Sequence, residues 1–205
     1  MKSSVDTVRR RPGRPLSFDR DAALQRALEL FWRQGYDTTS LADLTAAMRI
    51  TPPSLYAAFG SKEQLFLEAK ERYDAATERI LGPLLEGSPT ARAAIEGFLV
   101  AAARAYRDPS APPGCFVLGA ASNFAPDSAR VARVLRDRRA QTEARLARRI
   151  ARGKRAGELP RTVNASELAA FYYTVVRGMS AQARDGASRR KLLAVAAAAM
   201  SAWPA

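Results

Sequence analysis

Residues 27–66 read ALELFWRQGYDTTSLADLTAAMRITPPSLYAAFGSKEQLF. Apolar residues recur in this stretch at helical spacing, and capping residues and glycines punctuate them. The stretch therefore predicts short helices joined by tight turns.

The first helix of this region is predicted to begin near Asp19. Leu24, Leu28 and Phe31 follow at intervals of four and three residues, which places them on one helical face. Gly35 ends the helix, because glycine tolerates the backbone conformation that closes a helix.

Two further helices of about two turns each are predicted next. Ser40 and Asp43 resemble a capping box at the start of the second helix. Thr51 is the expected N-cap of the third helix, with Pro52 in its first turn and Gly60 as its end. About three residues separate the two helices, which is the helix-turn-helix arrangement.

The third helix is the candidate reader of DNA. Its inward residues belong to the core, so Pro53, Ser54, Tyr56 and Ala57 are left to face outward. An exposed aromatic residue on a two-turn helix needs an explanation, and a phosphate contact supplies one.

The same stretch resembles the DNA-binding domain of TetR/AcrR-type transcriptional regulators. The resemblance covers about a quarter of the chain and is carried in register by Gly35, Tyr36, Thr39, Leu55, Tyr56, Phe59, Lys62 and Glu63. It implies an all-α protein with an N-terminal helix-turn-helix domain and a larger helical ligand-binding and dimerisation domain. The implied function is that of a sequence-specific repressor, a homodimer that a small-molecule inducer releases from a palindromic double-stranded DNA operator.

On this interpretation the chain has three parts: a basic extended arm (1–18), the helix-turn-helix domain (19–66) and the ligand-binding and dimerisation domain (67–205). The expected DNA-binding residues are Arg9, Arg10, Arg11, Arg14, Thr39, Ser40, Arg49, Thr51, Pro53, Ser54, Tyr56 and Lys62.

Arg49 departs from the family pattern, which has glycine in the turn before the reading helix. A residue other than glycine in a left-handed turn costs roughly 1 kcal/mol. The turn is therefore either strained or shifted, and a phosphate contact by Arg49 would offset the cost.

The arm contains the sequence RRRPGRP at residues 9–15. Prolines keep it extended, and arginines in such an arm suit the narrow minor groove of A·T-rich DNA. The alternative is a solubilising tail.

The composition favours an anionic partner and disfavours catalysis. The formal net charge is +13, and histidine, the usual general base and metal ligand, does not occur. We therefore expect no enzyme activity, no metal and no cofactor. The single cysteine and the lack of a membrane-length apolar segment indicate a cytoplasmic protein without a membrane partner.

A second basic cluster lies far from the arm. Residues 130–161 contain twelve basic and three acidic side chains. The simplest interpretation is a solvated helix face whose arginine stems cover apolar surface.

Beyond the helix-turn-helix, helices are expected at 62–81, 88–107, 115–124, 127–153, 165–185 and 188–203. In the resembled family the last two pair with their copies in a dimer. The expected interface residues are Leu168, Phe171, Val175, Met179, Leu192, Val195, Ala196, Ala199 and Trp203, because these give a broad apolar face with small residues for close approach.

The inducer pocket is expected among the central helices. Its candidate residues are Phe98, Tyr106, Cys115, Phe116, Phe124 and Tyr172, although residues of these types are more often part of a packed core than ligand contacts. Cys115 is either a packed cysteine or, if its thiolate is stabilised, a sensor of electrophiles or oxidants.

Two other classes of function stay open. One is an enzyme or binding protein with an incidental basic face, which the missing histidine and phosphate loop disfavour. The other is a DNA-coating protein without sequence preference, which the ratio of specific to random DNA affinity would distinguish from a repressor.

Overall fold

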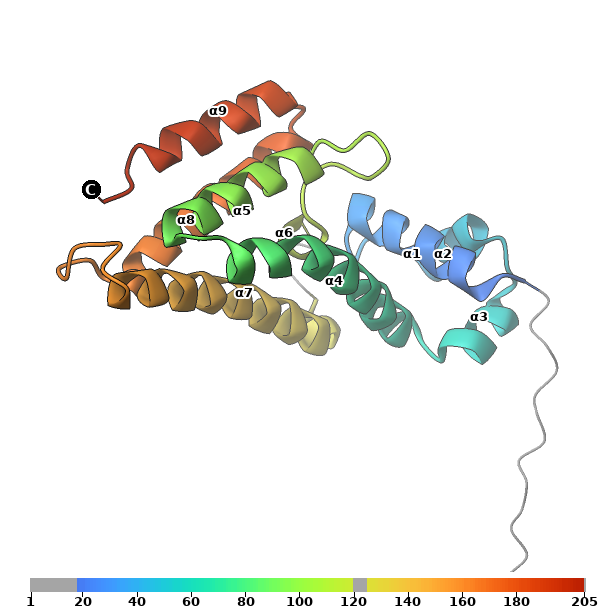
Figure 1. Ribbon diagram of the computed structural model, residues 1–205. Coiled ribbons are helices and arrows are strands. Elements are labelled where there is room, and N and C mark those ends of the chain that lie inside the picture. The colour runs from blue at the N-terminus through green and yellow to red at the C-terminus, as the bar shows by residue number, and fades with distance from the viewer. Residues whose placement is uncertain (1–17, 120–124, 205) are drawn as a thin grey trace, which may run out of the picture.

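The computed structural model describes residues 18–119 and 125–204 and shows an all-helical chain (Figure 1). Within these ranges it contains helices, turns and loops but no strand. The helices are α1 (Arg20–Gln34), α2 (Leu41–Met48), α3 (Pro52–Phe59), α4 (Lys62–Gly87), α5 (Ala91–Ala105), α6 (Phe116–Gly119), α7 (Ala129–Arg155), α8 (Ala165–Arg184) and α9 (Arg189–Met200), with a 3-10 turn at Pro126–Ser128. The predicted fold class is thereby confirmed.

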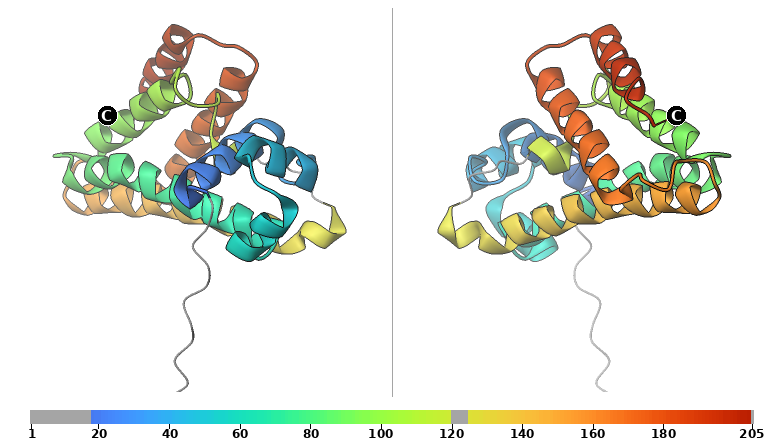
Figure 2. Two further views of the ribbon diagram at one scale, coloured as in Figure 1. Left: turned by 90° about the vertical axis from the view of Figure 1, so that its right-hand side faces the viewer. Right: turned by 90° about the vertical axis from the view of Figure 1, so that its left-hand side faces the viewer.

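The first three helices begin where the sequence predicts. Asp19 caps α1, Ser40 and Asp43 form a reciprocal capping box on α2, and Thr51 caps α3. These caps satisfy backbone N–H groups that have no partner within the helix. Helices α1, α2 and α3 lie together at one end of the molecule, beside the start of α4 (Figures 1 and 2).

Helix α4 differs from its prediction, because it passes through Gly82 and Pro83 and ends only at Gly87. Helix α7 carries side chains that bind the end of α4. The guanidinium of Arg152 donates to the carbonyl of Glu86 over 3.0 Å, and that of Arg149 donates to the carbonyl of Ser88 over 3.1 Å. These bonds satisfy carbonyls at the C-terminus of α4, which have no partner within the helix.

The remaining helices form the larger part of the molecule. Helix α7 packs along α8, and α5 lies between α4 and α9 (Figures 1 and 2). The predicted helix at 115–124 is described only as α6, four residues long, and the rest of that prediction, including Phe124, lies outside the described residues. The predicted division at residue 66 falls inside α4, which runs from the helix-turn-helix into the larger part.

Aromatic side chains join the two parts of the molecule. Phe66 of α4 stacks on Phe116 of α6 with ring centroids 5.2 Å apart, and Phe31 meets Phe66 edge to face at 5.1 Å. Both Phe116 and Phe66 are fully buried. Phe116 is therefore a core residue between the parts.

Candidate nucleic-acid interface and ligand cavity

Helix α3 presents a small exposed face. Leu55 and Phe59 are buried in the core, whereas Tyr56 is 48% exposed and Pro53 and Ala57 are also exposed. A large aromatic side chain that its own chain leaves half exposed is available to a partner. The outward face of α3 is therefore the candidate reading surface.

The turn before α3 keeps its place and is strained. Arg49 adopts φ 58° and ψ 46°, the left-handed conformation, and it has the only positive φ outside glycine among the described residues. Its N–H donates to the carbonyl of Ala46 over 3.2 Å, and the N–H of Ile50 donates to that of Thr45 over 3.1 Å. The side chain of Arg49 is exposed beside α3.

The polar residues predicted to contact DNA around α3 differ in their exposure and hydrogen bonds. The hydroxyl groups of Thr51 and Ser54 lie 2.9 Å apart, and Ser40 serves the capping box of α2. Thr39 is fully buried, and its hydroxyl donates to the carbonyl of Gly35 over 2.6 Å. The prediction of Thr39 as a DNA contact is wrong for its side chain, which closes the end of α1.

Lys62 begins α4 and lies over the ring of Tyr36, with its Nζ 4.4 Å from the ring centroid. Burial lowers the pKa of Lys62, and the carboxylate of Asp37 opposes that shift. The helix dipole disfavours a cation at the N-terminus of a helix, and the Tyr36 ring and the Asp37 carboxylate offset this effect at Lys62.

The four arginines predicted to read DNA from the arm, Arg9, Arg10, Arg11 and Arg14, lie outside the described residues.

A cavity of about 100 Å³ lies between α4, α5, α7 and α8. Phe98, Tyr106 and Cys115 line it as predicted, but Phe116 and Tyr172 do not. Tyr172 is fully buried against Phe171 and Trp203, and the next residue, Tyr173, lines the cavity instead. Adjacent residues of a helix point about 100° apart, so an error of one residue in the cavity-facing side of α8 exchanges the two.

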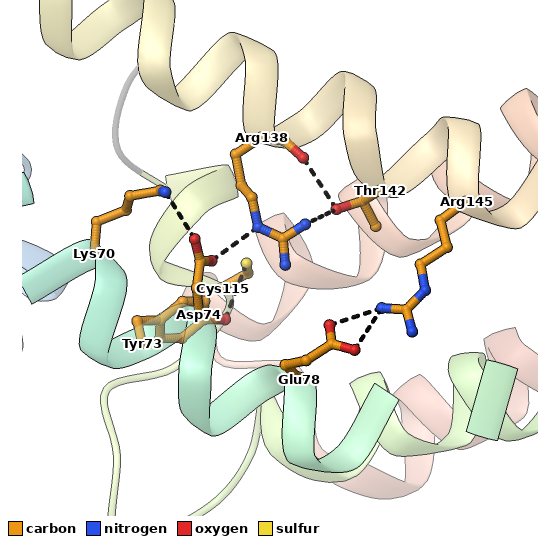
Figure 3. Close-up of polar contacts among 8 residues, drawn as sticks. All are labelled: Lys70, Tyr73, Asp74, Glu78, Cys115, Arg138, Thr142 and Arg145. Carbon is orange, nitrogen blue, oxygen red and sulfur yellow. Dashed lines mark hydrogen bonds and ion pairs between the residues drawn. The ribbon is translucent and has the colours of Figure 1, made fainter. Parts of the chain in front are cut away.

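Sequence reasoning missed the α4 and α7 sides of this cavity. Residues that line it from these helices include Tyr73, Asp74, Thr77, Ile80, Leu81, Arg138 and Thr142. At its rim Asp74 accepts from Arg138 Nε over 2.9 Å and pairs with Lys70 over 2.9 Å (Figure 3). Only an i, i+4 pairing of Lys70 with Asp74 was readable from the sequence, because Arg138 comes from a distant helix.

Cys115 is a packed thiol at the inner wall of the cavity. Tyr73 Oη donates to its Sγ over 3.1 Å (Figure 3), and its N–H donates to Ser180 Oγ over 2.9 Å. Burial raises the pKa of Cys115, and burial likewise raises that of Tyr173 to about 12. The thiolate that a sensor needs is therefore disfavoured in this state.

The basic cluster at 130–161 is not only a solvated helix face, because several of its arginines bind groups of α4. Arg138 binds Asp74, and Arg145 binds Glu78 over 2.7 Å (Figure 3). Arg149 is 5% exposed and reaches the end of α4. Several of these arginines thus hold α7 against α4.

Helices α8 and α9 present an outer face of mostly small residues. Phe171 is 42% exposed and Leu168, Val175, Val195 and Trp203 are partly exposed, as an interface requires. Four predicted interface residues, Met179, Leu192, Ala196 and Ala199, are instead buried in the protomer. The small residues that do face outward are Thr174, Gly178, Ala181, Ala194, Ala197 and Ala198.

These features define a helix-turn-helix DNA-binding protein with a separate cavity. The family model of bacterial regulatory proteins, tetR family, matches residues 23–69, and that of the tetracyclin repressor-like C-terminal domain matches residues 91–200. The chain belongs to the TetR family of transcriptional regulators.

Its relatives include two proteins of Escherichia coli (strain K12). The HTH-type transcriptional repressor ComR is 36% identical over 98% of this chain and 96% of ComR. The HTH-type transcriptional repressor BdcR is 35% identical over 92% of this chain and 90% of BdcR. Among solved structures, a cysteine mutant of the TetR family regulator CifR, complexed with 26bp double-strand operator DNA, is similar with a TM-score of 0.90 and 44% identity. That match covers 94% of this chain and 100% of the CifR chain.

No helix in the described part of the chain is both long enough and apolar enough to cross a membrane. Nor do the described residues bring together histidine, cysteine or carboxylate groups that could hold a metal ion.

Proposed function

We propose that this protein is a transcriptional repressor that binds a palindromic operator as a homodimer and leaves it when a small molecule occupies the cavity. The outward face of α3 carries the proposal, since Tyr56 is 48% exposed on a helix whose other side is core. The likeness to a CifR structure with operator DNA supports it. A repressor acts where chromosomal DNA is, in the cytoplasm.

The proposed DNA contacts come from two places. Pro53, Ser54 and Tyr56 of α3 would enter the major groove, with Thr51 and Ser40 at helix N-termini near phosphates. Arg49 and Lys62 would add charge on either side of α3. Charges of this kind position the protein, and the groove-facing side chains read sequence.

The cavity supports regulation by a small apolar molecule. Its volume, about 100 Å³, is below the roughly 150 Å³ of an apolar cavity that admits benzene. We therefore expect a ligand of that size to shift α4 relative to α5 or α7, against which it packs. Because α4 starts beside the reading helix at Lys62, such a shift is transmitted to the DNA-binding end.

The groups around the cavity suit the binding of a small molecule without its chemical conversion. The charged groups at the cavity rim, Asp74, Arg138 and Lys70, are paired with one another, and the tyrosines inside are held neutral by burial. These cavity groups therefore do not offer a free general base to a bound molecule.

Selection of bound duplexes from a random pool tests the function. We expect enrichment of one palindrome, and a Tyr56→Ala variant should bind it at least about tenfold more weakly, which corresponds to about 1.4 kcal/mol. Arg79→Ala is the control, because Arg79 is exposed on α4 away from α3. Equal binding of random and selected DNA would instead indicate a DNA-coating protein.

Regulation is tested by calorimetry of compounds that bind the protein. An inducer must bind less tightly when operator is present, by the same factor by which it weakens operator binding. Equal affinity with and without operator would show that the compound is no inducer.

A further inference from the structure

Arg184, near the end of α8, reaches across to the DNA-binding end of the molecule. Its Nη2 donates to the carbonyl of Trp32 in α1 over 2.9 Å. Its Nη1 donates to the carbonyl of Gly119 in α6 over 3.2 Å. One guanidinium thus joins three helices, of which α1 belongs to the helix-turn-helix part and α8 to the proposed dimer face.

Moving the Arg184 charge out of water costs free energy unless new contacts offset the loss of solvation. Arg184 Nε is buried without a hydrogen-bond partner, and no ion pair to a carboxylate is found for Arg184 among the described residues. Burial accordingly lowers the pKa of Arg184. The residue as a whole is partly buried, and its two hydrogen bonds replace part of the water that its charge loses.

Both acceptors are carbonyls at helix C-termini, where the helix dipole concentrates partial negative charge. Trp32 lies in the last turn of α1, and Gly119 is the last residue of α6. The guanidinium therefore serves as a shared cap for two helices of different parts.

Two glycines make room for this side chain. A Cβ atom on Gly119 would lie 1.7 Å from Arg184 Nη2, and one on Gly114 would lie 3.1 Å from Arg184 Cγ. Gly114 also leaves space for the carbonyl of Ser180, since its Cβ would lie 2.9 Å from that oxygen. The chain on both sides of α6 is thus shaped around Arg184 and its helix.

We propose that Arg184 is a positioning residue that fixes the DNA-binding end on α8 and thereby sets the half-site spacing that the dimer accepts. The inference rests on the proposed function, a homodimer, and on the expected pairing of α8 with its copy. If α8 is fixed at the dimer axis, a tie from α8 to the end of α1 limits how far α3 can shift relative to the partner's α3.

The geometry of DNA makes this restraint measurable. Recognition helices of a dimer must match half-sites one helical turn apart, about 34 Å, and one base pair more or less moves a half-site by about 3.4 Å and turns it by about 35°. A rigid dimer cannot follow both changes. A dimer whose DNA-binding ends can move relative to α8 can adjust to the shift and the rotation of the half-site at a small cost in binding free energy.

The test compares the selected operator with versions that have one base pair added or removed between the half-sites. Arg184→Gln removes the charge and the reach of the side chain. Gly119→Ala leaves the charge in place but displaces the flexible end of Arg184. Arg104→Gln is the matched control, because Arg104 is exposed on α5 and loses the same charge.

We expect the wild type and Arg104→Gln to prefer the selected spacing at least about tenfold, or about 1.4 kcal/mol. In Arg184→Gln and Gly119→Ala this preference should fall below about threefold while the dimer mass in sedimentation stays unchanged. If Arg184→Gln loses its helical circular dichroism, Gly119→Ala decides.

The inference is overturned if the folded variants lose affinity equally for all three spacings, which is the behaviour of a merely structural residue. It is also overturned if the wild type accepts all spacings equally. Failure of the wild type to select any palindrome would contradict the proposed function instead.

Discussion

At the scale of single residues, Arg49 has a strained backbone conformation that does not stabilise the fold. It holds φ 58° in the turn between α2 and α3, although glycine is the residue suited to that conformation. Its side chain is exposed beside the reading helix. The strain is thus placed where a positive charge can meet DNA.

Two substitutions separate the strain of Arg49 from its charge. Arg49→Gly should raise the free energy of unfolding by about 1 kcal/mol, because glycine relieves the left-handed strain. Arg49→Ala keeps the strain and should not raise it. Denaturation curves of both variants measure this, and equal stability of the two would contradict the strain.

The same pair tests the phosphate contact of Arg49. If the contact exists, both variants should lower the slope of log affinity against log salt by about one unit. Operator titrations across salt concentrations provide the slope, and an unchanged slope in both variants would exclude the contact.

Cys115 should react slowly, since burial raises its pKa and keeps the thiol protonated at neutral pH. It is the only cysteine of the sequence, so labelling with a disulfide reagent reports on it alone. The rate at pH 7 should lie well below that of a free thiol. Fast labelling of the folded protein at pH 7 would restore the sensor hypothesis.

The raised pKa also has a consequence for stability. Above about pH 8.5 the unfolded chain releases the thiol proton while the folded chain keeps it, so this contribution to stability is lost as pH rises. Below that pH it is fully present.

At the scale of elements, α4 and α7 are joined by ion pairs of unequal burial. The side chains of Arg138 and Asp74 are 19% and 20% exposed, whereas Glu78, the partner of Arg145, is 50% exposed. Screening by water weakens the exposed pair more than the buried one.

Arg138→Met should therefore cost about 2 kcal/mol of unfolding free energy, because Asp74 is left largely buried with Lys70 alone. Arg145→Met should cost less than about 1 kcal/mol. Chemical denaturation of both variants measures the difference. A larger cost for Arg145→Met would show that burial does not rank these two pairs.

At the scale of the whole molecule, the outer face of α8 is part of the surface at which we expect two chains to meet. A Cβ atom on Gly178 would find nothing within 4 Å, and Gly178 lies two helical turns beyond the exposed Phe171. This position is therefore open in the protomer.

Gly178→Leu should keep the protomer folded and dissociate the dimer, because a bulky side chain there would separate the paired helices. Sedimentation measures the mass, and circular dichroism checks the fold. Gly157→Leu is a control for bulk on an exposed glycine, although its φ of 81° adds strain. An intact dimer of Gly178→Leu would place the interface elsewhere.

The sequence by itself determined the helix-turn-helix and its boundaries. The caps at Asp19, Ser40 and Thr51 act on backbone groups within three residues of themselves, so they are readable without knowledge of distant neighbours. Apolar spacing likewise identified Leu55 and Phe59 as inward residues, which left Tyr56 outside.

Only the tertiary structure decided which residues face the cavity, the outer surface of α8 and α9, and the core. Helix α4 continues past Pro83, and arginines more than sixty residues later in the chain bind its end. Met179 and Ala196 are buried in the protomer although their spacing also suited an interface. The tie from Arg184 to Trp32 spans 152 residues, and no local pattern records it. Such contacts depend on how whole helices pack, which periodicity along one helix cannot specify.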